Sequence, residues 1–304
     1  MNKLTRRSVY CPGTKVRVCM EIGINRKEHK HKGQLGGGAA NSGSLKRINL
    51  ALQGGGFHGA FAWGVLDRLL EDDCIDFDGI SATSVGAVNA TVLAYGLAVG
   101  GRAGARHALA DIWRRVANLA SLSPLQPTPF DRLTGNQSLE TSLAFVQFDI
   151  MTRLFSPYQL NPFNINPLRS ILCDTVDFDA IRNARCPIKL FLSATNVRSG
   201  KILNRINEIS FNSSLMREMR SVCFVTKLIE EQKILDKTIK RMLIHSIEAS
   251  DVMQAMSVGS KLNADWDLVN KLMKVGRERA DTWIAANFDR LGEQSTTDIH
   301  KKYL

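Results

Sequence analysis

The segment Ile48–Gly59 has the sequence Ile-Asn-Leu-Ala-Leu-Gln-Gly-Gly-Gly-Phe-His-Gly, and it decides the class of fold. Its first five residues form a short apolar run that stops at a glycine cluster, as a buried strand of a parallel sheet does. Apolar residues then recur near helical spacing, at Phe61, Val65, Leu66 and Leu69. The pattern therefore predicts a strand, a glycine turn and a helix.

A second unit of the same kind comes next. An apolar run at Gly79–Ala82 leads into the turn Thr83–Gly86, and small apolar residues continue to Ala94, as expected of a buried helix. The order strand-helix-strand-helix is typical of an α/β domain. Helical spacing over 100–119 and an apolar strand pattern at Ile188–Thr195 extend this domain.

The rest of the body divides into two parts. Residues 121–167 hold six of the eight prolines and an amphipathic piece near 139–154, and we expect this loop-rich stretch to cover a cleft. Helical spacing dominates the last third, at Leu215–Ile229, Ile239–Ala255 and Trp266–Phe288. We therefore expect an α/β domain over 47–202, followed by an α-helical region over 203–304.

The amino-terminal residues 1–46 differ from the body in composition. Eleven Lys or Arg against two Glu over residues 1–47 account for +9 of the formal net charge of +11, so the body is nearly neutral. Because the basic segment has few periodic apolar residues, we expect a flexible arm. A solvated tail is the simpler interpretation, and contact with an anionic membrane surface is the alternative.

The chain of 304 residues, with 44% apolar and 23% charged residues, has ordinary globular composition. No run approaches the roughly 18 to 20 apolar residues that span a bilayer, and the start shows no secretory apolar region. Six scattered cysteines without a Cys-x-x-Cys pair suggest neither a disulfide framework nor a zinc site. We expect a cytoplasmic location, reduced thiols and no bound metal.

Gly54, Gly55 and Gly56 come directly after the first predicted strand. Glycines at this place let successive backbone N–H groups converge on an anion, and the start of the next helix adds positive partial charge. An oxyanion or a phosphate suits such a loop. A tight turn packed against the sheet is the simpler alternative.

Ser84 occupies the corresponding turn after the second strand. A serine on a sharp strand-to-helix turn projects its hydroxyl above the sheet, and the small neighbours Ala82 and Gly86 fit the crowding of such a nucleophile elbow. A serine that only caps the helix is the alternative. Acyl transfer needs both a nucleophile and anion donors, so the two turns together favour that chemistry.

Three stretches of the chain resemble the patatin-like phospholipases, namely Leu52–Ala60, Ile80–Ala90 and Leu192–Gly200, and Ile206–Leu215 is similar to the bacterial branch of that family. The resemblance extends over roughly residues 48–304. It implies a three-layer α/β/α core and hydrolysis of lipid acyl esters by a Ser-Asp dyad, without His. Neither a metal nor an organic cofactor is needed by this chemistry, so we expect none.

The resemblance also implies roles for residues of the two motifs. Ser84 is the implied nucleophile. The implied oxyanion hole is lined by Gly54, Gly55 and Gly56, and the glycines that flank the two motifs are Gly59 and Gly86. The implied substrate is a lipid acyl ester.

One part of the family pattern is absent from this chain. The family places its base in an Asp-Gly-Gly or Asp-Gly-Ala motif after further strands, whereas the single Asp-Gly here, at Asp78, lies before Ser84 and up to about 20 Å away along one strand. Almost nothing separates Lys201 from Asn204. We infer an internal deletion that removes the acid and truncates the sheet, with impaired turnover and an exposed sheet edge as the expected results.

Other groups can be considered as the base. Asp174, Asp177 and Asp179 fall in a predicted surface turn, where solvated acids are the simpler interpretation. His58 adjoins the glycines, but its position suits the first turn of a helix, and the resemblance requires no histidine. None of these four residues is therefore the expected partner of Ser84.

Two functions of other classes are alternatives. Gly54-x-Gly56-x-x-Gly59 fits a dinucleotide-binding fingerprint, but the acids about twenty residues later, Asp76 and Asp78, precede the second strand instead of following it. A non-catalytic lipid-surface or protein-interaction module, with residues 1–46 on anionic headgroups, is the second alternative. A specific nucleic-acid binder is disfavoured because the basic segment has no interleaved aromatic residues.

Overall fold

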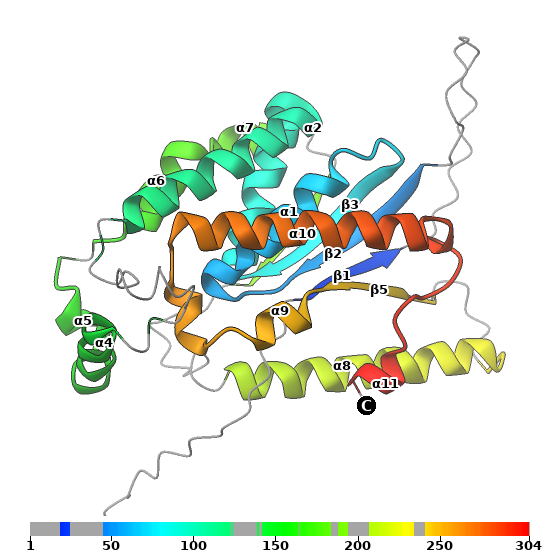
Figure 1. Cartoon of the computed structure of the whole chain (residues 1–304). Helices are drawn as coiled ribbons and strands as arrows, with labels where there is room; N and C mark the ends of the chain where they lie inside the picture. The colour runs from blue at the N-terminus through cyan, green and yellow to red at the C-terminus, as the bar shows by residue number, and fades with distance from the viewer. Residues whose placement is uncertain are drawn as a thin grey trace, which may run out of the picture.

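The computed structural model describes residues 19–24, 45–121, 123, 139, 142–163, 165–183, 188–193, 207–233 and 241–303. These residues form a five-stranded sheet with helices packed around it (Figure 1). No helix among them is long and apolar enough to cross a membrane. The strands are β1 (Cys19–Ile24), β2 (Lys46–Leu52), β3 (Ile75–Thr83), β4 (Lys189–Ser193) and β5 (Leu243–Glu248).

The sheet has the strand order β4-β3-β2-β1-β5. β2, β3 and β4 are parallel, with Leu52 opposite Ala82 and Ala82 opposite Leu192. β1 pairs antiparallel with β2 on one side and with β5 on the other, so β5 runs in the same direction as β2. The carboxyl ends of β2, β3, β4 and β5 therefore share one edge of the sheet.

Helices form the connections that follow β2 and β3. η1 (Gly56–Gly59) and α1 (Ala60–Leu69) follow β2, and α2 (Val85–Ala120) follows β3. α2 folds back on itself at Gly100 and Gly101, where the backbone angles are not helical. The other helices are α4 (Leu143–Leu154), α5 (Pro157–Leu160), α6 (Pro167–Thr175), α7 (Phe178–Asn183), α8 (Asn207–Glu230), α9 (Ser250–Gln254), η3 (Val258–Leu262), α10 (Trp266–Asn287), η4 (Phe288–Arg290) and α11 (Ile299–Tyr303).

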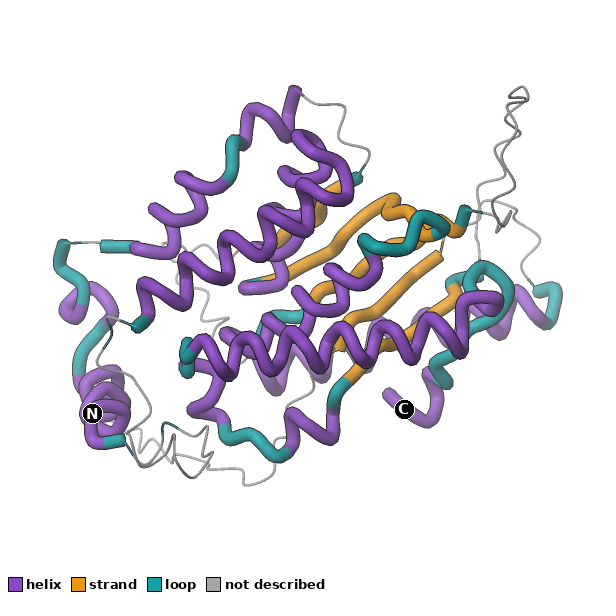
Figure 2. The backbone as a smooth tube through the Cα atoms, turned by 45° about the horizontal axis from the view of Figure 1, so that its top comes forward, coloured by secondary structure: helices purple, strands orange, loops and turns teal. Residues whose placement is uncertain are grey.

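Helices lie on both faces of the sheet. Neighbouring residues of a strand point to opposite faces, so the contacts of Ile244 and His245 in β5 show which helix covers each face. His245 packs edge-on against Trp283 of α10, whereas Ile244 packs with Met219 of α8. This confirms the expected α/β fold, with α10 and its neighbour α1 on one face (Figure 2).

The crossing of α1 and α10 depends on two glycines. A Cβ on Gly64 would overlap the carbonyl oxygen of Met273, and a Cβ on Gly276 would overlap that of Phe61. The two backbones therefore approach as closely as only glycine allows. Beneath them the core of β2, α1 and β3 contains the fully buried side chains of Ile48, Leu50, Phe61, Leu66 and Ile80.

Most of the expected elements are confirmed. β2, β3 and β4 coincide with the three predicted strands, and α1, α2, α8 and α10 coincide with predicted helices. Within the loop-rich stretch 121–167 the structure describes α4 and α5, and residues 124–138 lie outside the described part.

Two expectations are wrong. Residues 19–24, expected to belong to a flexible arm over 1–46, form β1 in the interior of the sheet. Residues 243–248, expected to continue a helical stretch over 239–255, form β5. In both segments, pairing with neighbouring strands decides the structure where the local pattern does not. The other residues of 1–44 lie outside the described part of the chain.

Candidate functional site

Ser84 lies at the turn between β3 and α2, with backbone angles φ 53° and ψ −129°. Among the described residues other than glycine, only Ser84 and Gln232 have a positive φ. This conformation is costly for a residue with a Cβ, and such strained turns cluster at functional sites. The residue is exposed, and no described residue makes a hydrogen bond to its hydroxyl. The turn thus presents an accessible serine at the carboxyl edge of the sheet.

The glycine loop packs directly against the Ser84 turn. A Cβ on Gly54 would lie 2.8 Å from the Cβ of Ser84 and 3.5 Å from its Oγ. Gly59 faces Val85, where a Cβ would lie 2.5 Å from Cγ1, and Gly86 approaches the end of β2 equally closely. These close approaches explain why both motifs use glycine. The two motifs form one packed unit.

Gly55 and Gly56 complete the loop. Gly56 has φ +57°, and a Cβ at this position would overlap the backbone carbonyl of Lys261 in η3, so both its conformation and its surroundings require glycine. The carbonyl of Gly55 accepts a hydrogen bond from the backbone N–H of His58 at 3.3 Å, which closes the turn into η1. The structure thus gathers the predicted glycines and Ser84 at one edge of the sheet.

Asn89 of α2 supports this unit, and the sequence analysis did not identify it. Its side-chain amide donates to the carbonyl of Gly59 at 3.0 Å and accepts from Nε1 of Trp113 at 2.9 Å. Asn89 is fully buried, and Trp113 stacks on Trp63 with ring centroids 6.0 Å apart. A polar residue within a run of small apolar residues was the available signal. These bonds hold the end of the glycine loop against both halves of α2.

His58 does not form a catalytic pair with Ser84. Its side chain is fully buried, and Nε2 lies 2.8 Å from the Oγ of Ser260 in η3. Burial, with a smaller contribution from the charge of Lys261, lowers the pKa of His58 from 6.5 to about 4. An imidazole with so low a pKa is a poor proton acceptor at neutral pH.

The candidate acids do not bond to Ser84 either. Asp174 is exposed on α6, Asp177 accepts backbone N–H bonds at the start of α7, and Asp179 pairs with Arg182 at 3.2 Å. Asp78 lies at a register irregularity within β3, away from its carboxyl end. Among the residues that the structure describes, no carboxylate bonds to Ser84, and no cluster of His, Cys, Asp or Glu is arranged to hold a metal ion.

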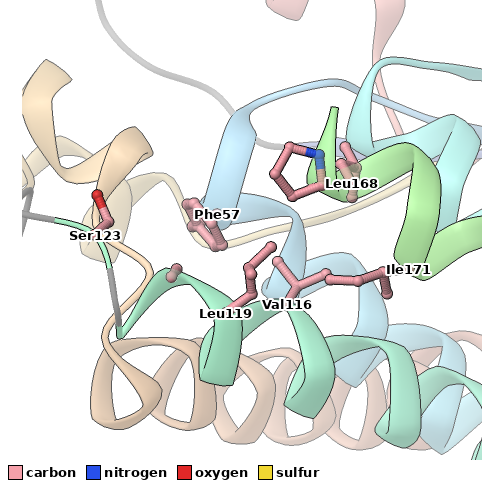
Figure 3. A pocket seen from close by; sticks show the side chains of 8 residues that line it. Phe57, Val116, Leu119, Ser123, Leu168 and Ile171 are labelled. Atoms are coloured by element: carbon pink, nitrogen blue, oxygen red, sulfur yellow. The ribbon is translucent and has the colours of Figure 1, made fainter. Parts of the chain in front are cut away.

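An apolar pocket of about 460 Å³ lies beside the glycine loop (Figure 3). Phe57, the residue after Gly56, forms its wall on the side of the loop. The carboxyl end of α2 and the start of α6 form the other walls. The residues that line the pocket are Phe57, Val116, Leu119, Ala120, Ser123, Pro167, Leu168 and Ile171.

Because α2 folds back at Gly100 and Gly101, its carboxyl end, which lines the pocket, runs back toward its start at Ser84. A Cβ on Gly96 would overlap the backbone of Ala105, and Trp113 bonds to Asn89, so the two halves of α2 run antiparallel side by side. Continuing this pairing toward the start of α2 places Ser84 alongside the pocket-lining stretch 116–120. The pocket therefore adjoins the glycine loop through Phe57 and lies toward the end of α2 at which Ser84 stands.

Comparison with known proteins assigns the chain to a family. No curated protein and no solved structure matches it. A family model described as patatin-like phospholipase matches residues 50–244, which is more than half of the chain and includes the glycine loop, the Ser84 turn and β4. Residues after 244, with η3 and α10, lie outside the match. The chain belongs to the patatin-like phospholipase family.

Proposed function

We propose that this protein is a lipid acyl ester hydrolase scaffold in which Ser84 attacks the ester carbonyl. The observation that carries the proposal is the strained Ser84 turn packed against Gly54. A serine that only capped α2 would adopt an ordinary extended conformation, and its hydroxyl would accept a hydrogen bond from a backbone N–H of the first turn; Ser84 does neither.

The reaction follows from the placement of the two motifs. The Oγ of Ser84 bonds to the carbonyl carbon of the ester, and the carbonyl oxygen becomes an oxyanion. Backbone N–H groups of Gly54, Gly55 and Gly56, with the positive end of the following helix, stabilise this charge. The Ser84 proton passes to solvent, the bond to the alcohol oxygen breaks and the alcohol leaves with a proton from solvent, so that an acyl group remains on Ser84. Water then attacks this acyl group, releases the fatty acid and restores the Ser84 hydroxyl.

The weak step is removal of the Ser84 proton. Among the described residues none bonds to the Ser84 hydroxyl: His58 is buried and bonded to Ser260, Asp177 and Asp179 bond to other groups, and Asp174 is exposed on α6. Loss of one member of a serine-based unit costs on the order of 10⁴-fold in turnover, while an intact oxyanion hole leaves residual catalysis. We therefore propose slow turnover.

The apolar pocket supports an acyl chain as the part of the substrate that is bound. Its walls carry no charged side chain, and a volume of about 460 Å³ falls within the range of small-molecule sites. Each methylene moved from water into such a pocket contributes about 0.8 kcal/mol. The apparent affinity for esters should therefore rise about fourfold per added methylene until the pocket is filled.

Hydrolysis of medium-chain nitrophenyl esters by the protein and its Ser84→Ala variant tests the proposal. Circular dichroism and thermal unfolding first establish that both proteins are folded. Slow turnover that is lost in the variant, with KM falling as the acyl chain lengthens, supports the proposal. Equal rates in two folded proteins contradict the role of Ser84, and turnover typical of a complete catalytic dyad contradicts the impairment.

A second candidate function, attachment to a lipid surface without catalysis, is favoured by the exposed apolar side chains over 146–168. Phe163 is 85% exposed and Leu154 is 69% exposed. The only charged residues over 143–168 are Asp149 and Arg153, which pair with each other at 2.8 Å. The large exposed apolar residues of this surface are Val146, Phe148, Ile150, Met151, Leu154, Phe155, Leu160, Phe163, Ile165 and Leu168.

This surface is continuous with the pocket, because Leu168 belongs to both. Sedimentation with phosphatidylcholine vesicles, using the Leu154→Ser/Phe163→Ser variant as a comparison, tests it. Binding that the variant loses supports attachment through 146–168. Binding only to anionic vesicles, abolished by salt and by removal of residues 1–18, supports attachment through the basic segment instead. No binding to either vesicle removes this candidate.

A further inference from the structure

His58 and Ser260 form a buried hydrogen-bonded pair between the glycine loop and η3. Both residues are 0% exposed, and Nε2 of His58 lies 2.8 Å from Oγ of Ser260. The one hydroxyl proton of Ser260 is donated to the carbonyl of Ser257 at 2.6 Å. The proton between His58 and Ser260 therefore resides on Nε2, and the imidazole donates. The bond gives η3 a fixed anchor on the loop.

η3 contacts the same loop at a second point, two residues from the first. The backbone carbonyl of Lys261 lies against Gly56, in the space that a side chain would fill. Phe57, which lines the pocket, stands between Gly56 and His58. η3 therefore fixes the loop on both sides of Phe57.

η3 is in turn attached to the close-packed helix pair. The side chain of Asn263 accepts from the backbone N–H of Asp265 at 3.0 Å, and Asp265 caps α10. α10 crosses α1, which begins directly after the loop, at Gly64 and Gly276. The carboxyl-terminal segment, which comprises η3 and α10 (residues 258–287), thus holds the loop at two places. η3 contacts it directly at η1, and α10 holds it through α1. All of these contacts come from residues outside the family match.

We propose that His58 and Ser260 are positioning residues, through which the carboxyl-terminal segment sets the position of the loop N–H groups beside Ser84. The inference rests on the proposed function, because it assigns a role in the same site. Oxyanion support is needed in the transition state more than in the bound state. Breaking the pair should therefore slow the chemical step at Ser84 and leave the binding of the acyl chain in the pocket unchanged.

Phosphonylation of Ser84 by a 4-nitrophenyl ester of a medium-chain alkylphosphonate gives the first readout. The Oγ of Ser84 bonds to phosphorus and its proton passes to water, while the bond from phosphorus to 4-nitrophenolate breaks. The released 4-nitrophenolate is measured, and a negatively charged phosphoryl oxygen occupies the oxyanion position. We expect Ser260→Ala and His58→Phe to lower the maximal labelling rate at least about tenfold, with the half-saturating reagent concentration unchanged. His58→Gln, which retains a side-chain N–H near the position of Nε2, should restore most of the rate.

Thr296→Val is the matched control. It removes the hydroxyl that bonds to His245, another fully buried histidine, at 2.9 Å, and it lies away from the loop. Amide hydrogen exchange of the peptide over 53–57 is measured in the same proteins and requires no reaction at Ser84. Faster exchange in Ser260→Ala, but not in Thr296→Val, supports the proposal even if no protein is labelled. Unchanged exchange, or equal loss of labelling rate in both variants, overturns it. Absence of labelling in the unaltered protein counts only against the proposed function.

Discussion

Ser84→Gly should stabilise the protein although it removes the proposed nucleophile. The φ of 53° and ψ of −129° at Ser84 lie in a region that glycine adopts readily and that costs a serine or alanine about 1–3 kcal/mol. The hydroxyl makes no hydrogen bond to a described residue, so Ser84→Ala should leave the free energy of unfolding nearly unchanged. The strain is thus predicted to be stored at the site itself.

Ser142 supplies the control that isolates this strain. It also precedes a helix, α4, without a side-chain cap bond, but its φ of −76° is ordinary. At Ser142, as at Ser84, the free energies of unfolding of the glycine and alanine variants differ through the capping preference and the backbone entropy of glycine. Only Ser84 adds the strain of a positive φ. The glycine-minus-alanine difference at Ser84 should exceed that at Ser142 by about 1–3 kcal/mol, or roughly 2 to 8 °C in Tm. Urea unfolding of the four variants measures it, and equal differences at the two positions would refute the argument.

Three other outcomes are expected. Gly54→Ala places a methyl group 2.8 Å from the Cβ of Ser84, so labelling by the phosphonate should fall at least about a hundredfold while circular dichroism stays unchanged; normal labelling would contradict the packing. Ile22→Pro removes a backbone donor from the interior strand β1 and should lower the free energy of unfolding in urea by about 1–3 kcal/mol, whereas an unchanged midpoint would mean that β1 is dispensable. Burial lowers the pKa of both His58 and His245 from 6.5 to about 4, so the unfolded chain binds these protons at higher pH than the folded one does. Stability should therefore be complete above about pH 6.5 and fall toward pH 4, by up to roughly 3 kcal/mol per histidine, and a flat urea midpoint between pH 7 and 4.5 would contradict this.

The parallel half of the fold was predictable because its signals are local. Each strand of the β2, β3 and β4 set is a short apolar run that ends at a turn, and each of the first two is followed by residues at helical spacing. The glycines and Ser84 were predicted as candidate site residues for the same reason, since a turn with close backbone approach leaves few residue types that fit. In the structure these turns do approach other atoms closely: a Cβ on Gly54 would lie 2.8 Å from the Cβ of Ser84, and a Cβ on Gly56 would overlap the carbonyl of Lys261.

β1 and β5 were not predictable because neither carries its own signal. Leu243, Ile244 and Ile247 have spacings of one and three, which suit a helix face as well as a buried strand. Cys19–Ile24 is short and lies in a basic segment. Each becomes a strand through pairing with the other, and this pairing joins residues more than two hundred positions apart.

Asn89 and Ser260 were missed for a related reason. Asn89 acts through Trp113, which reaches it only because α2 folds back at Gly100 and Gly101. Ser260 reaches His58 from the carboxyl-terminal segment, 202 positions later. A search for chemical motifs finds side chains that react, and these two residues hold backbone in place. Supporting residues of this kind follow from the packing of helices, which no short stretch of sequence encodes.

β1 runs antiparallel to both of its neighbours, and this direction has one consequence for the sheet and another for the site. β2 and β5 run the same way with one position between them, and β1 fills that position antiparallel, so that both neighbours obtain their backbone hydrogen bonds. A parallel strand there would deliver its carboxyl end, and the loop after it, to the edge that holds Gly54 and Ser84. β1 instead brings its first residue, Cys19, to that edge, beside Glu248. The loop after β1 therefore begins at the opposite end of the sheet from Gly54 and Ser84. The pairing of β1 between β2 and β5 thus fills the interior of the sheet independently of the proposed chemistry at Ser84, and stabilising β1 should raise the stability of the protein without raising its turnover.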